Sequence, residues 1–325
     1  MDYSIVPYDG SSPGIPPMKP WPSLAAKAFY FKCKSPAGSS VFFYDSRPDK
    51  TPESQNSRFS EPKFPVFVLI HGLGDEADSW RHLIPLLNAQ GCRTLAPDLG
   101  GFGRSAPPGR ISVKNYAAAI LGLLEAVCPG TPAILAGNSM GAVIAETAAA
   151  QRPDLVKGLV LIDGSIPGGP SNPGPLAVLK MLFSRKWYRA FRNYPETAWA
   201  SLFPYYADLE AMPRDDREFL RQRVMDRVNS STQEQAFFAV QRNLVLTYMM
   251  RRSWYIRKIR NFKGKILLIW GEKDRIMPIS SAETFKALRY DINLIIIKGA
   301  GHLPQQERPE ETAKIMSDFA DSTAD

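Results

Sequence analysis

The sequence predicts an α/β fold built on a doubly wound, mostly parallel β-sheet. Two observations support this prediction. Short apolar runs, of the kind that a parallel sheet buries on both faces, alternate along the chain with segments of helical periodicity. One such run, residues 132–136, leads through a serine between two glycines into a helical stretch, which is the order strand, sharp turn, helix. Strands that alternate with helices are joined by crossover connections, and these produce parallel pairing.

Length and composition allow one large α/β domain with an inserted subdomain. The chain has 325 residues, of which 44% are hydrophobic and 22% charged, as is ordinary for a soluble globular protein. No apolar run reaches the ~18 residues that cross a bilayer, and the first residues resemble neither a signal peptide nor a transit peptide. Three widely spaced cysteines, Cys33, Cys92 and Cys128, suggest neither disulfides nor a zinc site. We therefore expect a cytoplasmic protein.

The N-terminal part of the chain is expected to hold two strands among irregular segments. Residues 1–23 are rich in Pro, Gly and Ser, which predicts an irregular arm. Two aromatic-rich runs at 28–31 and 41–44 flank a turn-forming Pro-Ala-Gly-Ser-Ser sequence, so they are expected to form a β-hairpin. Residues 45–63 are polar, include three prolines and predict a loop.

Strands and helices alternate from residue 65 onward. The predicted strands lie at 66–70, 93–97, 133–136, 156–163, 266–270 and 293–297, and the predicted helices at 79–90, 113–127, 142–148, 279–289 and 308–320. The alternation breaks at a Gly, Pro, Ser and Asn-rich segment, residues 165–176, after which only helices are predicted until about residue 258. We therefore expect a core of residues 24–168 and 259–325, interrupted by a helical cap, residues 169–258.

The most informative motif is Gly-Asn-Ser-Met-Gly at residues 137–141. A serine on a sharp turn between strand and helix has a strained backbone and an exposed hydroxyl group. Glycines flank it because a side chain there would collide with the neighbouring strand and helix. The motif and its context predict that Ser139 is the nucleophile of a serine hydrolase.

A serine nucleophile needs a base within hydrogen-bonding distance and a third group that orients the base. One of the three histidines, His302, lies just past the last predicted strand, and sites in open α/β sheets form at the carboxyl ends of strands. Asp274, which follows the strand at 266–270, is the preferred orienting acid. Glu272 and Asp163 are the alternatives, because Glu272 is two residues away and Asp163 also ends a strand.

Acyl transfer also needs hydrogen-bond donors for the oxyanion, each worth about 3–4 kcal/mol. The backbone N–H of Met140, directly after the nucleophile, is one expected donor. The loop after the strand at 66–70 is expected to supply the second, from the N–H of Leu73. His71 is then expected to shape this loop, and His82 to be a surface or packing residue.

The chain is basic, with a net charge of +8, and the excess lies in the predicted cap. Residues 180–260 contain 16 Lys and Arg against 8 Asp and Glu. We expect a solvated helical face; steering of an anionic substrate and contact with an anionic membrane surface are the alternatives, and membrane contact is not expected. No nucleic-acid-binding motif accompanies the charge, so nucleic acid is not an expected partner.

Taken together, the motifs resemble those of the α/β-hydrolase superfamily over residues 64–168 and 262–322. They are His-Gly-Leu-Gly at 71–74, Asp-Leu-Gly-Gly-Phe-Gly-Arg-Ser at 98–105, the serine motif, Gly-Glu-Lys-Asp at 271–274 and Gly-His at 301–302. The chain order Ser139, Asp274, His302 matches that of the superfamily's triad. The resemblance implies an eight-stranded sheet and a cap over the substrate pocket. The Asn-Ser-Met sequence is similar to that of carbon–carbon bond hydrolases, whereas Leu303-Pro304 looks more like capped esterases and lipases.

We therefore expect a serine hydrolase that cleaves a carboxylic ester or a related acyl compound through an acyl-enzyme. The alternatives are a carbon–carbon bond hydrolase of ring-fission-type products and a non-enzymatic receptor for a small ligand. The aromatic residues of the cap favour a small-molecule substrate with an apolar acyl or aromatic group. No metal or organic cofactor is needed, and the sequence assigns neither substrate-binding residues nor an oligomeric state.

Overall fold

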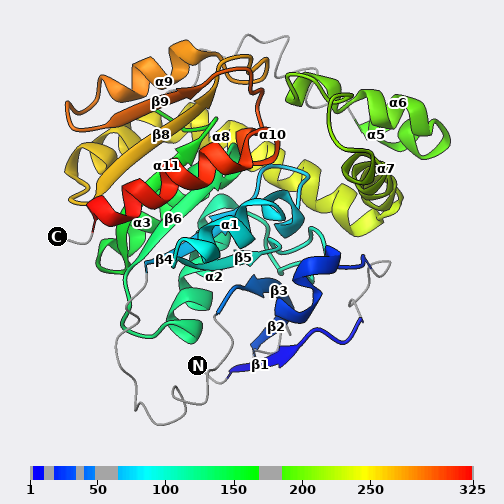
Figure 1. Cartoon of the computed structure of the whole chain (residues 1–325), viewed down its shortest axis with the longest axis horizontal. Coiled ribbons are helices and arrows are strands. Elements are labelled where there is room, and N and C mark those ends of the chain that lie inside the picture. The colour runs from blue at the N-terminus through cyan, green and yellow to red at the C-terminus, as the bar shows by residue number, and fades with distance from the viewer. Residues whose placement is uncertain (1–2, 11–17, 34–39, 48–64, 168–184, 324–325) are drawn as a thin grey trace.

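One β-sheet organises the molecule (Figure 1). The computed structural model describes residues 3–10, 18–33, 40–47, 65–167 and 185–323. Within these residues nine strands pair in the order β1-β2-β3-β5-β4-β6-β7-β8-β9. The strands are β1 (Tyr3–Pro7), β2 (Ala28–Cys33), β3 (Ser40–Asp45), β4 (Val66–Ile70), β5 (Arg93–Pro97), β6 (Ala133–Asn138), β7 (Val156–Ile162), β8 (Lys265–Gly271) and β9 (Asn293–Ile297). Strands β4 to β9 pair in parallel, whereas β1, β2 and β3 form antiparallel pairs at the edge next to β5. The prediction of a mostly parallel sheet is therefore confirmed.

Helices cover both faces of this sheet. They are α1 (Leu83–Ala89), α2 (Val113–Val127), α3 (Met140–Gln151), α5 (Arg185–Ala190), α6 (Pro195–Ala200), α7 (Arg214–Asn229), α8 (Ser231–Asn261), α9 (Ile279–Lys286), α10 (Pro304–Glu307) and α11 (Pro309–Ser322). Alternate residues of β4 belong to two cores, since Val68 packs with α2 and α3 and Leu69 packs with α1 and α11. None of the described helices combines the length and the hydrophobicity that a membrane span requires.

The N-terminal region differs from the irregular arm that its composition predicts. Tyr3–Pro7 forms β1 and pairs antiparallel with β2, from Tyr3 opposite Cys33 to Pro7 opposite Phe29. Pro22–Lys27 forms a short 3-10 helix. Strand β1 also explains why the sheet has one strand more than the eight that the family resemblance implies. The predicted hairpin of β2 and β3 is confirmed, while most of the predicted loop at 45–63 lies outside the described residues.

The described part of the predicted cap, residues 185–258, consists of helices without strands. Helices α5, α6 and α7 group together at one side of the molecule (Figure 1). Helix α8 begins beside them and continues to Asn261, where its last turns pack on α3 of the core. The hydroxyl groups of Thr147 on α3 and Tyr255 on α8 lie 2.6 Å apart. Helix α8 therefore runs without a break from the residues predicted to form the cap onto α3.

The turn between β6 and α3 depends on close backbone packing at Gly141. A Cβ atom at this position would lie 2.0 Å from the carbonyl oxygen of Ile70 in β4. We expect Gly141→Ala to lower the free energy of unfolding by about 1–3 kcal/mol or more, because the backbone of β4 cannot move aside cheaply. Urea denaturation measures this change. Gly122→Ala is the control, since a Cβ atom there meets nothing within 4 Å on α2 and should stabilise the helix by up to about 1 kcal/mol.

Candidate active site

Ser139 lies on the sharp turn between β6 and α3, as the motif predicts. Its backbone has φ 54° and ψ −114°, a conformation that non-glycine residues rarely adopt. The amide of Ser139 donates to the carbonyl of Ile162 at 2.9 Å, and its carbonyl accepts from Ala142 at 3.1 Å. The neighbouring strand and helix thus hold the strained turn, as is typical of functional positions.

His302 and Asp274 lie together at the carboxyl ends of β9 and β8. Nδ1 of His302 donates to Oδ2 of Asp274 at 2.8 Å, and both side chains are almost completely buried. Oδ1 of Asp274 accepts from the amides of Ile276 at 2.7 Å and Met277 at 3.0 Å, which fixes the carboxylate. The amide of His302 donates to the carbonyl of Tyr205 in the cap at 2.8 Å. This arrangement leaves Nε2 of the imidazole for another partner.

The alternative acids do not take this place. Glu272 accepts from the amide of Gly299 at 3.0 Å and is exposed. Asp163 is fully buried and accepts from the amide of Gly271 at 2.8 Å. Of the three carboxyl groups, the structure pairs Asp274 with His302.

Ser139 and His302 both line a cavity of about 350 Å³. Leu73, from the loop after β4, lines the same cavity, and Met140 opens α3 directly behind Ser139. A helix N-terminus presents unpaired N–H groups and partial positive charge. The two backbone positions expected to stabilise an oxyanion therefore belong to two different segments, the loop after β4 and the start of α3.

The other two histidines lie outside this group. His71 is buried; its Nε2 accepts from the amide of Leu99 at 2.9 Å, and its Nδ1 lies 2.8 Å from the carbonyl of Gly72. Both ring nitrogens are thus used by backbone groups, which agrees with a loop-shaping role. His82 contacts Oδ1 of Asp216 at 2.8 Å and is packed against the ring of Trp21.

The cap forms the far wall of the cavity, a contribution that the sequence did not assign to individual residues. Most of the cap side chains in this wall are apolar or aromatic: Tyr188, Phe191, Leu202, Tyr205, Tyr206, Leu220, Val224, Val228 and Phe237. The interleaved aromatic residues were the available signal for this wall, but their directions depend on tertiary packing. Arg227, Asp75 and Gln306 add a polar section.

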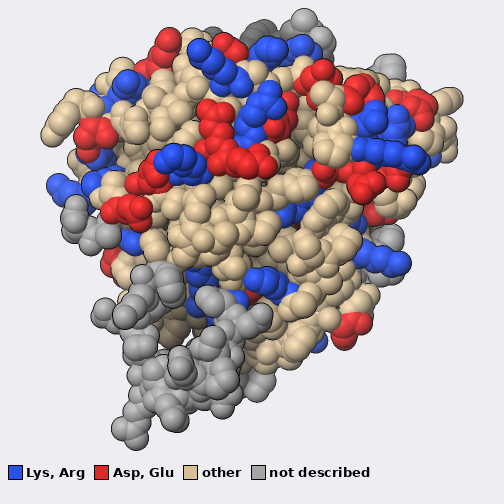
Figure 2. All heavy atoms as spheres, viewed as in Figure 1, with Lys and Arg blue, Asp and Glu red and all other residues tan. Residues whose placement is uncertain are grey.

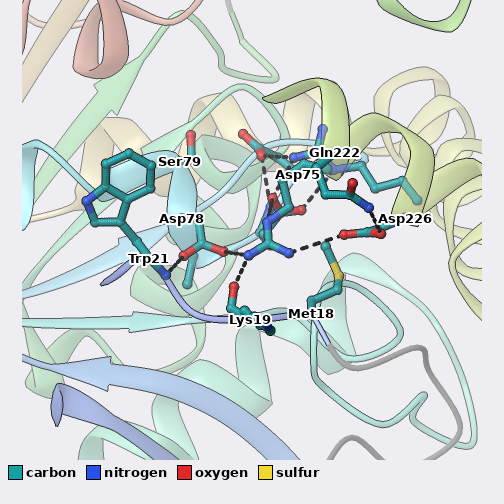
Figure 3. A network of polar contacts seen from close by, with 12 residues as sticks. Met18, Lys19, Trp21, Asp75, Asp78, Ser79, Gln222 and Asp226 are labelled. Carbon is teal, nitrogen blue, oxygen red and sulfur yellow. Dashed lines mark hydrogen bonds and ion pairs between the residues drawn. The ribbon is translucent and has the colours of Figure 1, made fainter. Parts of the chain in front are cut away.

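Buried ion pairs attach helix α7 of the cap to the core beside the cavity. Arg223 donates to Oδ2 of Asp78 at 3.2 Å, to Asp226 at 3.3 Å and to the carbonyl oxygen of Lys19 (Figure 3). Arg227 donates to Asp75 and to Glu76, each at 2.7 Å. These arginines of the cap are therefore neutralised by core carboxylates. On the face shown in Figure 2, basic and acidic side chains are interspersed.

Comparison with known proteins places these motifs in context. A family model described as the alpha/beta hydrolase family matches residues 67–315. The chain is 26% identical over 278 residues to the uncharacterized hydrolase YugF of Bacillus subtilis, covering 80% of this chain and 92% of that protein. It is 26% identical over 259 residues to Lipase 1 of Psychrobacter immobilis, covering 76% and 74%. A crystal structure of a membrane phospholipase A, described as a bacterial virulence factor, superposes with a TM-score of 0.70 at 26% identity, covering 91% and 87%.

Proposed function

The chain belongs to the alpha/beta hydrolase family, and on this basis we propose that it is a serine hydrolase that cleaves a carboxylic ester or a related acyl compound. The observation that carries the proposal is the convergence of two groups on one cavity. Ser139, on its strained turn, and His302, hydrogen-bonded to Asp274, both line that cavity. These are the parts that acyl transfer through a covalent intermediate requires.

In the proposed mechanism, Oγ of Ser139 attacks the acyl carbon while Nε2 of His302 takes the hydroxyl proton. Asp274 holds the Nδ1–H tautomer of His302 and stabilises the imidazolium that forms. The N–H groups of Met140 and Leu73 bind the oxyanion of the tetrahedral intermediate. His302 then protonates the leaving alkoxide, and the acyl-enzyme remains. Water, deprotonated by His302, attacks the acyl carbon and releases the acid and Ser139.

The lining of the cavity supports an apolar acyl or aromatic group in the substrate. Its cap side is built mainly from aliphatic and aromatic side chains, and such walls bind groups of the same character. A carbon–carbon bond hydrolase remains the second candidate because of Asn138 in the serine motif. However, Nδ2 of Asn138 donates to the carbonyl of His302 at 3.0 Å, so this side chain has a structural role that is independent of the substrate.

Hydrolysis of p-nitrophenyl esters from acetate to palmitate tests the proposal directly. Release of p-nitrophenol with a clear chain-length optimum is expected. Failure to cleave any ester, by folded protein, together with cleavage of a dienol ring-fission product would favour the carbon–carbon bond hydrolase. Failure with both substrates, together with a rise in Tm on ligand addition, would favour a receptor.

Cavity size should set the chain-length optimum. Val224 on α7 lines the cavity and is buried, so Val224→Phe fills part of the acyl space. We expect kcat/KM for the longest good ester to fall by roughly 10-fold or more, because pocket contacts are worth about 1–3 kcal/mol per methylene, while acetate hydrolysis changes little. Steady-state kinetics on the ester series measures this shift. The control is Leu246→Phe, because Leu246 is exposed on α8. If Val224→Phe lowered kcat/KM equally for all esters, the assignment of Val224 to the acyl site would be contradicted.

A further inference from the structure

Asp163, the buried acid that the proposed mechanism does not use, has an unusual backbone. It directly follows β7 and has φ 48°. Among the described residues, it and Ser139 are the two non-glycine residues with positive φ. Such conformations cost free energy and persist where the surroundings impose them, often at functional sites. The strain at Asp163 therefore points to a role beyond ending a strand.

The carboxyl group of Asp163 lies beside the Asp274–His302 pair. One carboxylate oxygen each of Asp163 and Asp274 and a ring nitrogen of His302 all lie within 4.8 Å of one another. Oδ1 of Asp163 accepts from the amide of Gly271 at 2.8 Å. Oδ2 is buried and receives no hydrogen bond from the described residues. An ionised Asp163 would thus leave one carboxylate oxygen buried without a donor, which is costly.

Of the two carboxyl groups, Asp274 is the one with the hydrogen-bond donors that an ionised carboxylate needs. It accepts hydrogen bonds from two backbone amides and from His302. Two adjacent buried carboxyl groups cannot both ionise at low cost, so the proton stays on the one with fewer donors. Burial raises the pKa of Asp163 well above its usual range, and the charge of Asp274, hydrogen bonding to Asp274 and the charge of Glu307 raise it further. The single amide of Gly271 opposes this only in part.

We propose that Asp163 is a protonated carboxylic acid whose Oδ2–H donates a hydrogen bond to Asp274. The two carboxyl groups then share one proton and present one negative charge to His302. This inference rests on the proposed function for its catalytic meaning, and it makes Asp163 a positioning residue that acts through Asp274. It also has a consequence for variants of Asp274. Without that neighbouring charge, Asp163 ionises and, from within 4.8 Å of the imidazole nitrogen, partly replaces the lost orienting acid.

Kinetics of three variants test this inference. Asp163→Asn keeps a donor toward Asp274 and an acceptor for Gly271, so kcat should stay within about 3-fold of wild type. Asp274→Asn should lose less activity than the double variant Asp163→Asn/Asp274→Asn, which should fall by about 10⁴-fold, as expected when the imidazole loses its orienting acid. We expect kcat of Asp274→Asn to exceed kcat of the double variant by at least about 10-fold. Equal activities of Asp274→Asn and the double variant would overturn the proposal, as would a loss in Asp163→Asn as large as that in Asp274→Asn.

An infrared measurement tests the shared proton without using activity. The spectrum of the wild type at neutral pH should contain a carbonyl stretching band of a protonated carboxyl group that is absent from Asp163→Asn. Glu146→Gln is the control, because Glu146 is also buried with a raised pKa but accepts its hydrogen bond from the amide of Ile166 and not from a residue of the triad. It should remove a different band and leave activity unchanged. If the carbonyl band remained in Asp163→Asn, the proposal that Asp163 is protonated would be refuted. Full activity of a Ser139→Ala variant would refute only the proposed hydrolase mechanism.

Discussion

Replacing Ser139 by alanine is expected to lower kcat for ester hydrolysis by at least about 10³-fold. The change removes the attacking oxygen and leaves the cavity, the cap and the Asp274–His302 pair in place. Residual activity above the uncatalysed rate would come from binding and from the oxyanion donors. Because the change removes a single oxygen atom from a side chain that lines an open cavity, Tm and KM should change little.

Covalent labelling identifies the same residue independently. A fluorophosphonate should add one adduct to the wild type, located by mass spectrometry on the peptide that contains Ser139, and none to Ser139→Ala. Ser253→Ala, on the exposed side of α8, is the matched control and should keep full activity and labelling. Undiminished ester hydrolysis by purified Ser139→Ala would remove this serine from the mechanism.

The central sheet was predictable because its strands carry a local signal. All five residues of β4 and all six of β6 are buried, and continuous apolar runs of this length are typical of parallel strands covered on both faces. Strand β1 was missed because its five residues lie in a segment whose Pro, Gly and Ser content predicts a loop. Its pairing with β2 joins residues more than twenty positions apart, which local composition does not encode.

The helices among the described residues of the predicted cap were predictable from the sequence, but the pairing of their charges was not. Helix α8 contains neither Gly nor Pro between Ser231 and Asn261, so no local break marks where it leaves the cap. The basic residues of α7 looked like a solvated face. Two of them, Arg223 and Arg227, instead pair with carboxylates 145 and 151 positions earlier in the chain. Contacts at such separation follow from the fold and leave no periodic pattern.

The motif residues of the site were predictable for a different reason. A sharp strand–turn–helix and polar residues directly after strands are features of a few consecutive positions, and the parallel sheet brings such positions to one edge. The sequence does not reveal that Asp163 is buried beside Asp274, because each residue only follows a predicted strand and the two are more than one hundred positions apart. The neighbourhood, and not the residue type, decides which of the two acids carries the charge.

Replacing Arg104 by methionine should produce the largest loss of stability. The guanidinium group is completely buried between Asp98, with Nε–Oδ2 at 2.7 Å, and Asp78, with Nη2–Oδ2 at 3.0 Å. It also lies 3.8 Å from the ring centre of Phe42. Methionine keeps much of the apolar volume but leaves two buried carboxylates without their shared cation. Removing one partner of a buried ion pair costs about 3–5 kcal/mol.

Urea denaturation at pH 7 measures this loss as a change in the free energy of unfolding. Arg214→Met is the matched control, because Arg214 forms an exposed pair with Glu218 on α7 and its loss should not change stability measurably. Arg104→Lys should recover only part of the stability, since an ammonium group cannot donate to both oxygens of Asp98 in a fixed plane as the guanidinium does. A stability equal to wild type in Arg104→Met would show that the carboxyl groups protonate or rearrange at little cost.

The same network predicts how the difference in the free energy of unfolding between the wild type and Arg104→Met depends on pH. Burial alone would raise the pKa of Asp78, but Arg104 and Arg223 outweigh it and hold that pKa below its usual range. A carboxyl group with a lowered pKa in the folded state stabilises the protein above its unfolded pKa of about 3.9. That stabilisation is lost as the pH falls through the folded-state value. The deficit of Arg104→Met relative to wild type should therefore be largest at neutral pH and shrink below about pH 4. A deficit that is constant down to acid pH would mean that Arg104 stabilises the fold by packing on Phe42, and not through its charge.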